Sequence, residues 1–249
     1  MRMKSISKLS SFLLLAGLFL GLTDAANAQM FSVKSEPNVS RPPSTGAYFG
    51  LEPAKFMYKP SSNDNNPYTR YTFSDPLYQL RLELPGIDIY LSSGWNLGNS
   101  NYLNFFNIGA QIQRVYPFFK SRHFIVGAPI RIQTDYLQVN SQRANNNADD
   151  FQQSSGTLGS GPAVLVRLGK GIRFTTVATI NYGFSVRSLG ATSGSLYIIN
   201  SQNRLYFDHL INDVGLSIGY DYDFSRYNLT GVRYDYALRG NSIVIGITF

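Results

Sequence analysis

Nine charged side chains are the strongest candidates for chemistry in this sequence. Each falls on the polar face of a segment in which polar and apolar residues alternate. Acidic and basic groups that share such a face can pair into a packed ionic network, or they can line a passage for charged solutes. The nine residues are Asp88, Arg131, Asp135, Arg167, Arg173, Arg187, Arg204, Asp221 and Asp223. The elements that position them decide between the two outcomes.

Catalytic groups are scarce. An enzyme that activates a nucleophile or a water needs a positioned base, and histidine is the commonest one. The two histidines, His123 and His209, both fall in or beside predicted short turns, and no Gly-x-Ser-x-Gly or His-Glu-x-x-His motif occurs. Asp149 and Asp150 stand in a loop of solvated composition. We therefore expect no enzyme activity, no metal site and no cofactor.

The segments that carry the charged residues have the two-residue period of β-strands, not the period of helices. The alternation persists for 11 to 16 residues at a time. Strands of soluble sandwiches, the alternative we considered, usually have about 5 to 6 residues, whereas a tilted strand needs about 9 to 11 to cross a membrane. The segments are 106–116, 124–136, 158–168, 172–187, 196–208 and 214–224. They predict an all-β protein, a closed antiparallel transmembrane β-barrel.

Connection lengths orient this barrel. Segments 118–122, 169–171 and 209–212 are short connections. Between them lie longer ones, at 94–103, 137–155, 189–194 and 225–239. In such barrels the short turns face the periplasm and the long loops face outward. Counting from residue 87 to residue 249 gives eight strands, with both ends on the periplasmic side.

The strand count depends on Pro85 and Gly86, where the apolar phase changes between Leu84 and Ile87. A phase change marks either a bulge within one strand or a turn between two. A turn would require a further strand, which residues 46–58 can supply, giving ten. We favour eight strands, whose interior is filled by side chains, over ten, whose interior leaves room for a narrow, weakly anion-preferring channel.

The first residues have the features of a secretory signal peptide. A basic start, an apolar run of about 14 residues and the small residues Ala26 and Ala28 predict cleavage after residue 28. The mature chain then carries 19 basic and 14 acidic residues, a net charge of +5, without the basic stripe typical of nucleic-acid binding. Residues 29–76 are rich in Pro, Ser and Asn, and we expect them to form a periplasmic or partly ordered segment before a barrel at 77–249.

The final strand resembles the C-terminal assembly signal of Gram-negative outer-membrane barrels. Apolar residues alternate up to a terminal Phe, with a Gly three positions before it: Ile243, Ile245, Gly246, Ile247 and Phe249. The resemblance covers roughly residues 77–249. It implies a small barrel of eight to ten strands in the bacterial outer membrane. Its partners would be outer-membrane lipids and the barrel-assembly machinery.

Taken together, these features predict an integral outer-membrane barrel with a packed polar lumen and a structural or surface-interaction role. A narrow porin-like channel for small solutes is the alternative, and a lipid- or peptide-modifying enzyme is the least favoured one. The sequence selects no particular protein or solute partner, since function depends on sites and not on the fold.

Overall fold

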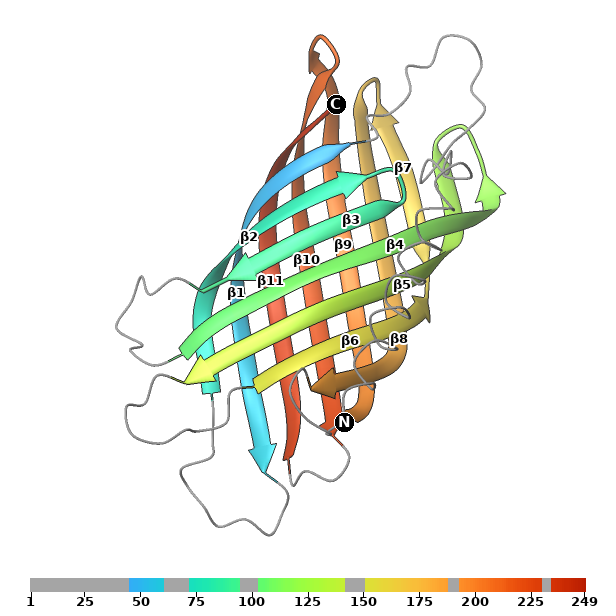
Figure 1. Ribbon diagram of the computed structural model, residues 1–249. Helices are drawn as coiled ribbons and strands as arrows, with labels where there is room; N and C mark the ends of the chain where they lie inside the picture. The colour runs from blue at the N-terminus through green and yellow to red at the C-terminus, as the bar shows by residue number, and fades with distance from the viewer. Residues whose placement is uncertain (1–44, 61–71, 95–102, 142–150, 188–192, 230–233) are drawn as a thin grey trace, which may run out of the picture.

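The chain folds into one antiparallel sheet that closes on itself (Figure 1). The computed structural model describes residues 45–60, 72–94, 103–141, 151–187, 193–229 and 234–249, so the predicted signal peptide lies outside the described residues. The strands are β1 (Gly46–Pro60), β2 (Thr72–Leu84), β3 (Ile87–Ser93), β4 (Leu103–Lys120), β5 (Phe124–Ser141), β6 (Phe151–Ser160), β7 (Ala163–Gly169), β8 (Ile172–Arg187), β9 (Ser193–Ile211), β10 (Val214–Leu229) and β11 (Tyr234–Thr248). Pairing of β1 with β11 and of β4 with β5 closes the ring, so the predicted closed barrel is confirmed. No helix among these residues is long and apolar enough to cross a membrane.

The sheet makes ten crossings, because β6 and β7 together form one. Both pair with β5 on one side and with β8 on the other. Gly161 and Pro162 interrupt the crossing, where proline lacks a ladder donor, and the Ala178 amide donates to the Pro162 carbonyl at 3.0 Å. A Cβ at position 161 would lie 2.0 Å from the Ala178 oxygen. The predicted strand 158–168 is therefore broken in its middle.

The favoured count of eight strands is wrong, and the alternative of ten is right. Pro85 and Gly86 form a tight turn, with Gly86 at φ 75° and Leu84 paired with Ile87. The further strand is β1, which pairs with β2 along nearly its whole length. The barrel consequently begins at Gly46 and not at residue 77, and part of the predicted N-terminal segment belongs to it.

The two faces of the barrel differ sharply in polarity. On β11, Ile243, Ile245 and Ile247 are 62%, 56% and 50% exposed and point outward, while the intervening Val244 is fully buried in the interior. Exposed apolar side chains also cover the outer face of the other strands, including Leu80, Ile132, Leu158 and Ile218. A large continuous apolar surface is unfavourable in water and suits the hydrocarbon layer of a membrane.

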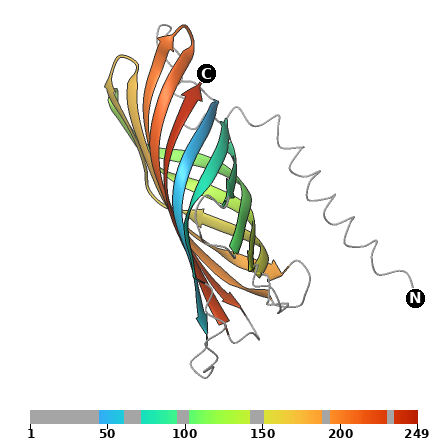
Figure 2. The same cartoon turned by 90° about the vertical axis from the view of Figure 1, so that its left-hand side faces the viewer.

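The ends of the barrel also differ. Short turns join β2 to β3, β4 to β5, β7 to β8 and β9 to β10, and the C-terminus lies at this same end (Figures 1 and 2). Both histidines are at this short-turn end, as predicted. Beside the β9–β10 turn, the pairing register shifts between Val214 and Leu216.

His209 stands in this irregular stretch with φ 56°. Glycine adopts positive φ without the steric cost that a Cβ brings. We expect His209→Gly to raise the free energy of unfolding by about 0.5–1 kcal/mol, measured by urea titration of the protein refolded in detergent. His123→Gly is the matched control, since His123 does not have positive φ. Equal stabilisation by both variants would contradict this explanation.

Candidate functional site in the barrel lumen

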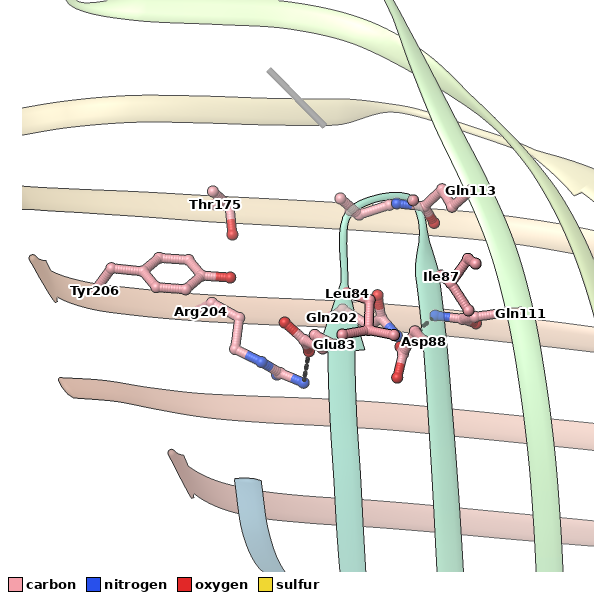
Figure 3. Close-up of a pocket in the computed structure, with 12 residues that line it drawn as sticks. Glu83, Leu84, Ile87, Asp88, Gln111, Gln113, Thr175, Gln202, Arg204 and Tyr206 are labelled. Atoms are coloured by element: carbon pink, nitrogen blue, oxygen red, sulfur yellow. Dashed lines mark hydrogen bonds and ion pairs between the residues drawn. The ribbon is translucent and has the colours of Figure 1, made fainter. Parts of the chain in front are cut away.

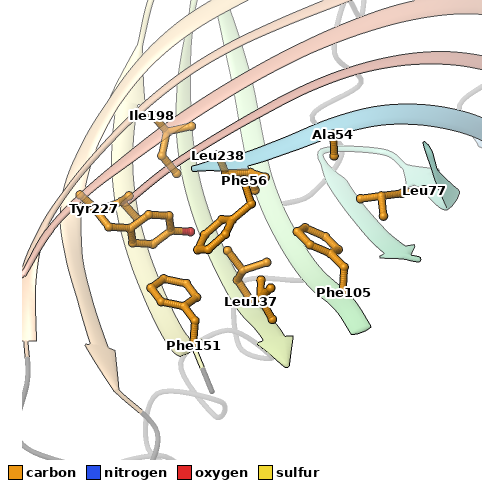
Figure 4. Packing of buried hydrophobic residues seen from close by; sticks show 11 residues of the cluster. Ala54, Phe56, Leu77, Phe105, Leu137, Phe151, Ile198, Tyr227 and Leu238 are labelled. Atoms are coloured by element: carbon orange, nitrogen blue, oxygen red, sulfur yellow. The ribbon is translucent and has the colours of Figure 1, made fainter. Parts of the chain in front are cut away.

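The lumen is filled in layers. Toward the ends of the strands away from the short turns, apolar side chains from opposite walls meet inside the barrel (Figure 4). This apolar layer consists of Ala54, Phe56, Leu77, Phe105, Leu137, Val139, Phe151, Leu196, Ile198, Tyr227 and Leu238. At its centre the ring of Phe151 lies 5.0 Å from that of Phe56 and 4.3 Å from that of Tyr236, centroid to centroid. Aromatic pairs at such separations pack favourably and exclude water.

Next to the apolar layer, the side chains of Arg81 and Arg204 both bind the carboxylate of Asp221. Asp221 is fully buried, and its Oδ2 accepts hydrogen bonds from Arg81 Nη1 at 2.7 Å and from Arg204 Nη2 at 2.8 Å. Arg81 also binds Asp88, with Nε 2.9 Å from both carboxylate oxygens, and Arg204 reaches Glu83 at 3.2 Å. We call these five residues the ionic network. Alternating opposite charges compensate one another where water cannot.

Arg81 and Glu83 were not among the nine residues expected from the sequence. They were missed because the eight-strand count began the barrel at the phase change instead of placing β2 inside it. The sequence does contain a pattern that could have identified them, the alternating polar residues Gln79, Arg81 and Glu83. These three residues face the lumen because Pro85 and Gly86 form a turn, which makes β2 a strand of the barrel. Glu52 on β1 was missed for the same reason.

Three of the predicted residues lie in the lumen but outside the ionic network. Arg131 is fully buried, and its Nε and Nη2 donate to Gln113 Oε1 at 2.8 and 2.6 Å. Asp135 accepts from Gln133 and from the Tyr90 hydroxyl. Asp223 accepts from Asn200. Side-chain amides, not opposite charges, are therefore hydrogen-bond partners of all three residues.

The remaining predicted residues lie toward the barrel ends. Arg173 pairs with Asp208 at 2.8 Å near the short turns and stacks 3.8 Å from the Tyr206 ring centroid. Arg167 is half-buried in β7 beside Arg173. Arg187 ends β8, and its side chain lies outside the described residues. The structure thus brings together Asp88, Arg204 and Asp221 of the predicted set, and it places Arg167 and Arg173 apart from them.

Two small cavities lie among the described residues of the lumen. One cavity of about 30 Å³ lies beside the ionic network, lined by Glu83, Asp88, Gln111, Arg204 and Tyr206 among others (Figure 3). A second, of about 40 Å³, lies between the ionic network and the apolar layer. Each has room for one or two water molecules. Ten strands allow a wider interior than eight, and long polar and aromatic side chains project into it.

A closed antiparallel barrel with an apolar outer face and a polar interior is a membrane-spanning β-barrel, since in lipid every strand edge must be paired. The chain therefore belongs to this fold class.

Solved structures with a similar barrel include the outer membrane protease OmpT from Escherichia coli, at 8% identity and a TM-score of 0.45 over 86% of this chain and 100% of that one. Ail, the attachment invasion locus protein of Yersinia pestis, matches at 11% identity and a TM-score of 0.26 over 83% and 99%. The Ralstonia pickettii toluene transporter TbuX matches at 6% and 0.25 over 85% and 90%. At these values none of them indicates a function for this chain. No protein-family model and no curated protein matches the sequence.

Proposed function

We propose that this protein is a non-conducting barrel of the bacterial outer membrane with a structural or surface-interaction role. The observation that supports the proposal is that the lumen contains the apolar layer and, next to it, the ionic network. An ion crossing the barrel would have to displace packed aromatic rings and then break buried ion pairs. Function then resides in the outer surface and in the loops at the end away from the short turns, which are the usual variable and binding parts of such folds.

Planar-bilayer recording tests this proposal. We expect the refolded full-length chain to insert without giving single-channel steps, in the same bilayers in which a known porin conducts. Heat-dependent migration on a gel, measured on the same sample, shows whether the inserted material is folded. Stable unitary steps from folded protein would overturn the proposal and favour the narrow porin-like channel.

The proposal gives the protein no catalytic role. This part of the proposal is supported by the position of His123 and His209, which lie at the short-turn end, away from the apolar layer and from the central carboxylates. Turnover of a lipid or peptide substrate by refolded protein, absent from a boiled sample, would contradict it.

A further inference from the structure

Four exposed cations lie together at the short-turn end of the barrel. They come from the last part of β4, from the β4–β5 turn and from the β7–β8 turn. The two turns are neighbours, because β5 pairs with β7 and the Arg167 amide donates to the His123 carbonyl at 2.7 Å. We call these cations the basic patch, which consists of Arg114, Lys120, Arg122 and Lys170.

No acidic residue neutralises the basic patch. Residues 103–127 and 160–187, which include β4, β7 and β8, contain no Asp or Glu. Asp208 lies beside the β7–β8 turn, but its carboxylate is already bound to Arg173 at 2.8 Å. None of the four cations forms an ion pair with another described residue. The patch therefore presents a positive potential to whatever lies against it.

Exposed apolar side chains are interleaved with these cations. The rings of Phe119 and Phe124 stack with their centroids 5.1 Å apart. The guanidinium of Arg114 lies 5.4 Å from the centroid of the Tyr116 ring and so extends toward the short-turn end. Cations mixed with exposed rings are typical of the boundary between lipid and water, whereas a partner dissolved in water would leave the rings uncovered. The apolar residues, all 40% to 73% exposed, are Tyr116, Phe118, Phe119, Phe124 and Leu168.

We propose that the basic patch binds the head-group phosphate of an anionic phospholipid of the phosphatidylglycerol class. Lys and Arg side chains at a membrane surface attract anionic lipids, and clusters of them bind the head groups. Short turns of such barrels face the periplasm, so this lipid belongs to the periplasmic leaflet of the outer membrane. The inference rests on the membrane location given under the proposed function, and conduction has no part in it.

The test places a fluorescent reporter in the patch of the full chain. Trp95 is the only tryptophan, so Trp95→Phe combined with Phe118→Trp leaves one tryptophan, at position 118. The protein is refolded into phosphatidylcholine vesicles that contain phosphatidylglycerol or phosphatidylcholine with a nitroxide quencher near the head group. We expect labelled phosphatidylglycerol to quench at about one tenth of the concentration that labelled phosphatidylcholine needs, or less, at low salt. High salt should reduce this preference, because exposed charges are screened.

A triple variant in the same reporter background removes most of the charge of the patch: Lys120→Gln, Arg122→Gln, Lys170→Gln. It is expected to bring the two lipids to within about twofold of one another, because one cation of four remains. The matched control removes the same charge from three exposed residues toward the other end of the barrel: Lys55→Gln, Arg226→Gln, Arg239→Gln. This control should keep the preference, and heat-dependent gel migration checks that both variants fold.

The possible results separate this inference from the proposed function. Equal quenching by the two lipids, or a preference that the triple variant retains, would overturn the phospholipid site alone. Quenching by neither lipid would contradict both the site and the membrane location. Displacement of labelled phosphatidylglycerol by soluble polyglutamate at constant ionic strength would indicate an acidic protein segment as the occupant and would overturn the lipid assignment.

Discussion

Replacing Asp221 by alanine is expected to destabilise the barrel by about 3–5 kcal/mol, the usual cost of removing one partner from a buried ion pair. The variant leaves the guanidinium groups of Arg81 and Arg204 facing one another across the space that the carboxylate occupied. Arg81 keeps Asp88 as a partner and Arg204 keeps Glu83, so the barrel should remain closed but unfold at lower urea. Tryptophan or tyrosine fluorescence during urea titration in detergent measures the change.

The control is Asp213→Ala, which removes the same side chain from an exposed turn. Surface substitutions of this kind usually change stability by less than about 0.5 kcal/mol. If Asp221→Ala and Asp213→Ala unfolded at the same urea concentration, the ionic network would not contribute to stability as described.

The second large effect is expected on the outer face. Ile245 is 56% exposed, and its neighbours on the adjacent strands, Phe49 and Ile218, are also apolar. An arginine at this place would put a charge against lipid with no counter-ion. Ile245→Arg should therefore cost about 2–4 kcal/mol, as charged residues do near the middle of a bilayer.

The free-energy cost of a charged side chain depends on its depth in the bilayer, so a position near the membrane surface provides the control. Phe118 is 73% exposed near the short-turn end of β4, where an arginine reaches water and head groups. Phe118→Arg is expected to cost about 0–1 kcal/mol in the same lipid vesicles. Equal costs for the two variants would mean that the apolar outer face does not lie in the hydrocarbon layer.

The alternation of polar and apolar residues was sufficient to predict the class of fold. It predicted the strands now seen as β8 and β10 with the correct inward face, and it placed Asp88, Arg131, Asp135, Arg204, Asp221 and Asp223 in the lumen. Even the irregular segment 196–208 is a strand, β9. Its outward Ser201 and Asn203, which weakened the pattern, bind each other, and Asn203 also accepts from Thr176 at 2.7 Å.

The sequence alone did not decide the number of strands or the partners of each charge. At Pro85 and Gly86 a bulge and a turn give the same change of phase, and only the pairing of Leu84 with Ile87 distinguishes them. The partners depend on register around the whole ring, which joins Arg81 to Asp221 across 140 positions of sequence. No local pattern specifies such a contact.

The seam between β1 and β11 has a consequence for how the polypeptide can be rearranged. Thr45 and Phe249 exchange backbone hydrogen bonds, at 3.3 and 3.0 Å, so the end of the chain lies beside the start of β1 at the short-turn end (Figure 2). A short peptide joining these two positions would convert the seam into one more hairpin. New termini could then be made in a loop at the opposite end, since circular permutation succeeds best where chain ends are close and the new break is at the surface. The barrel is in this sense a ring of hairpins whose starting point is arbitrary.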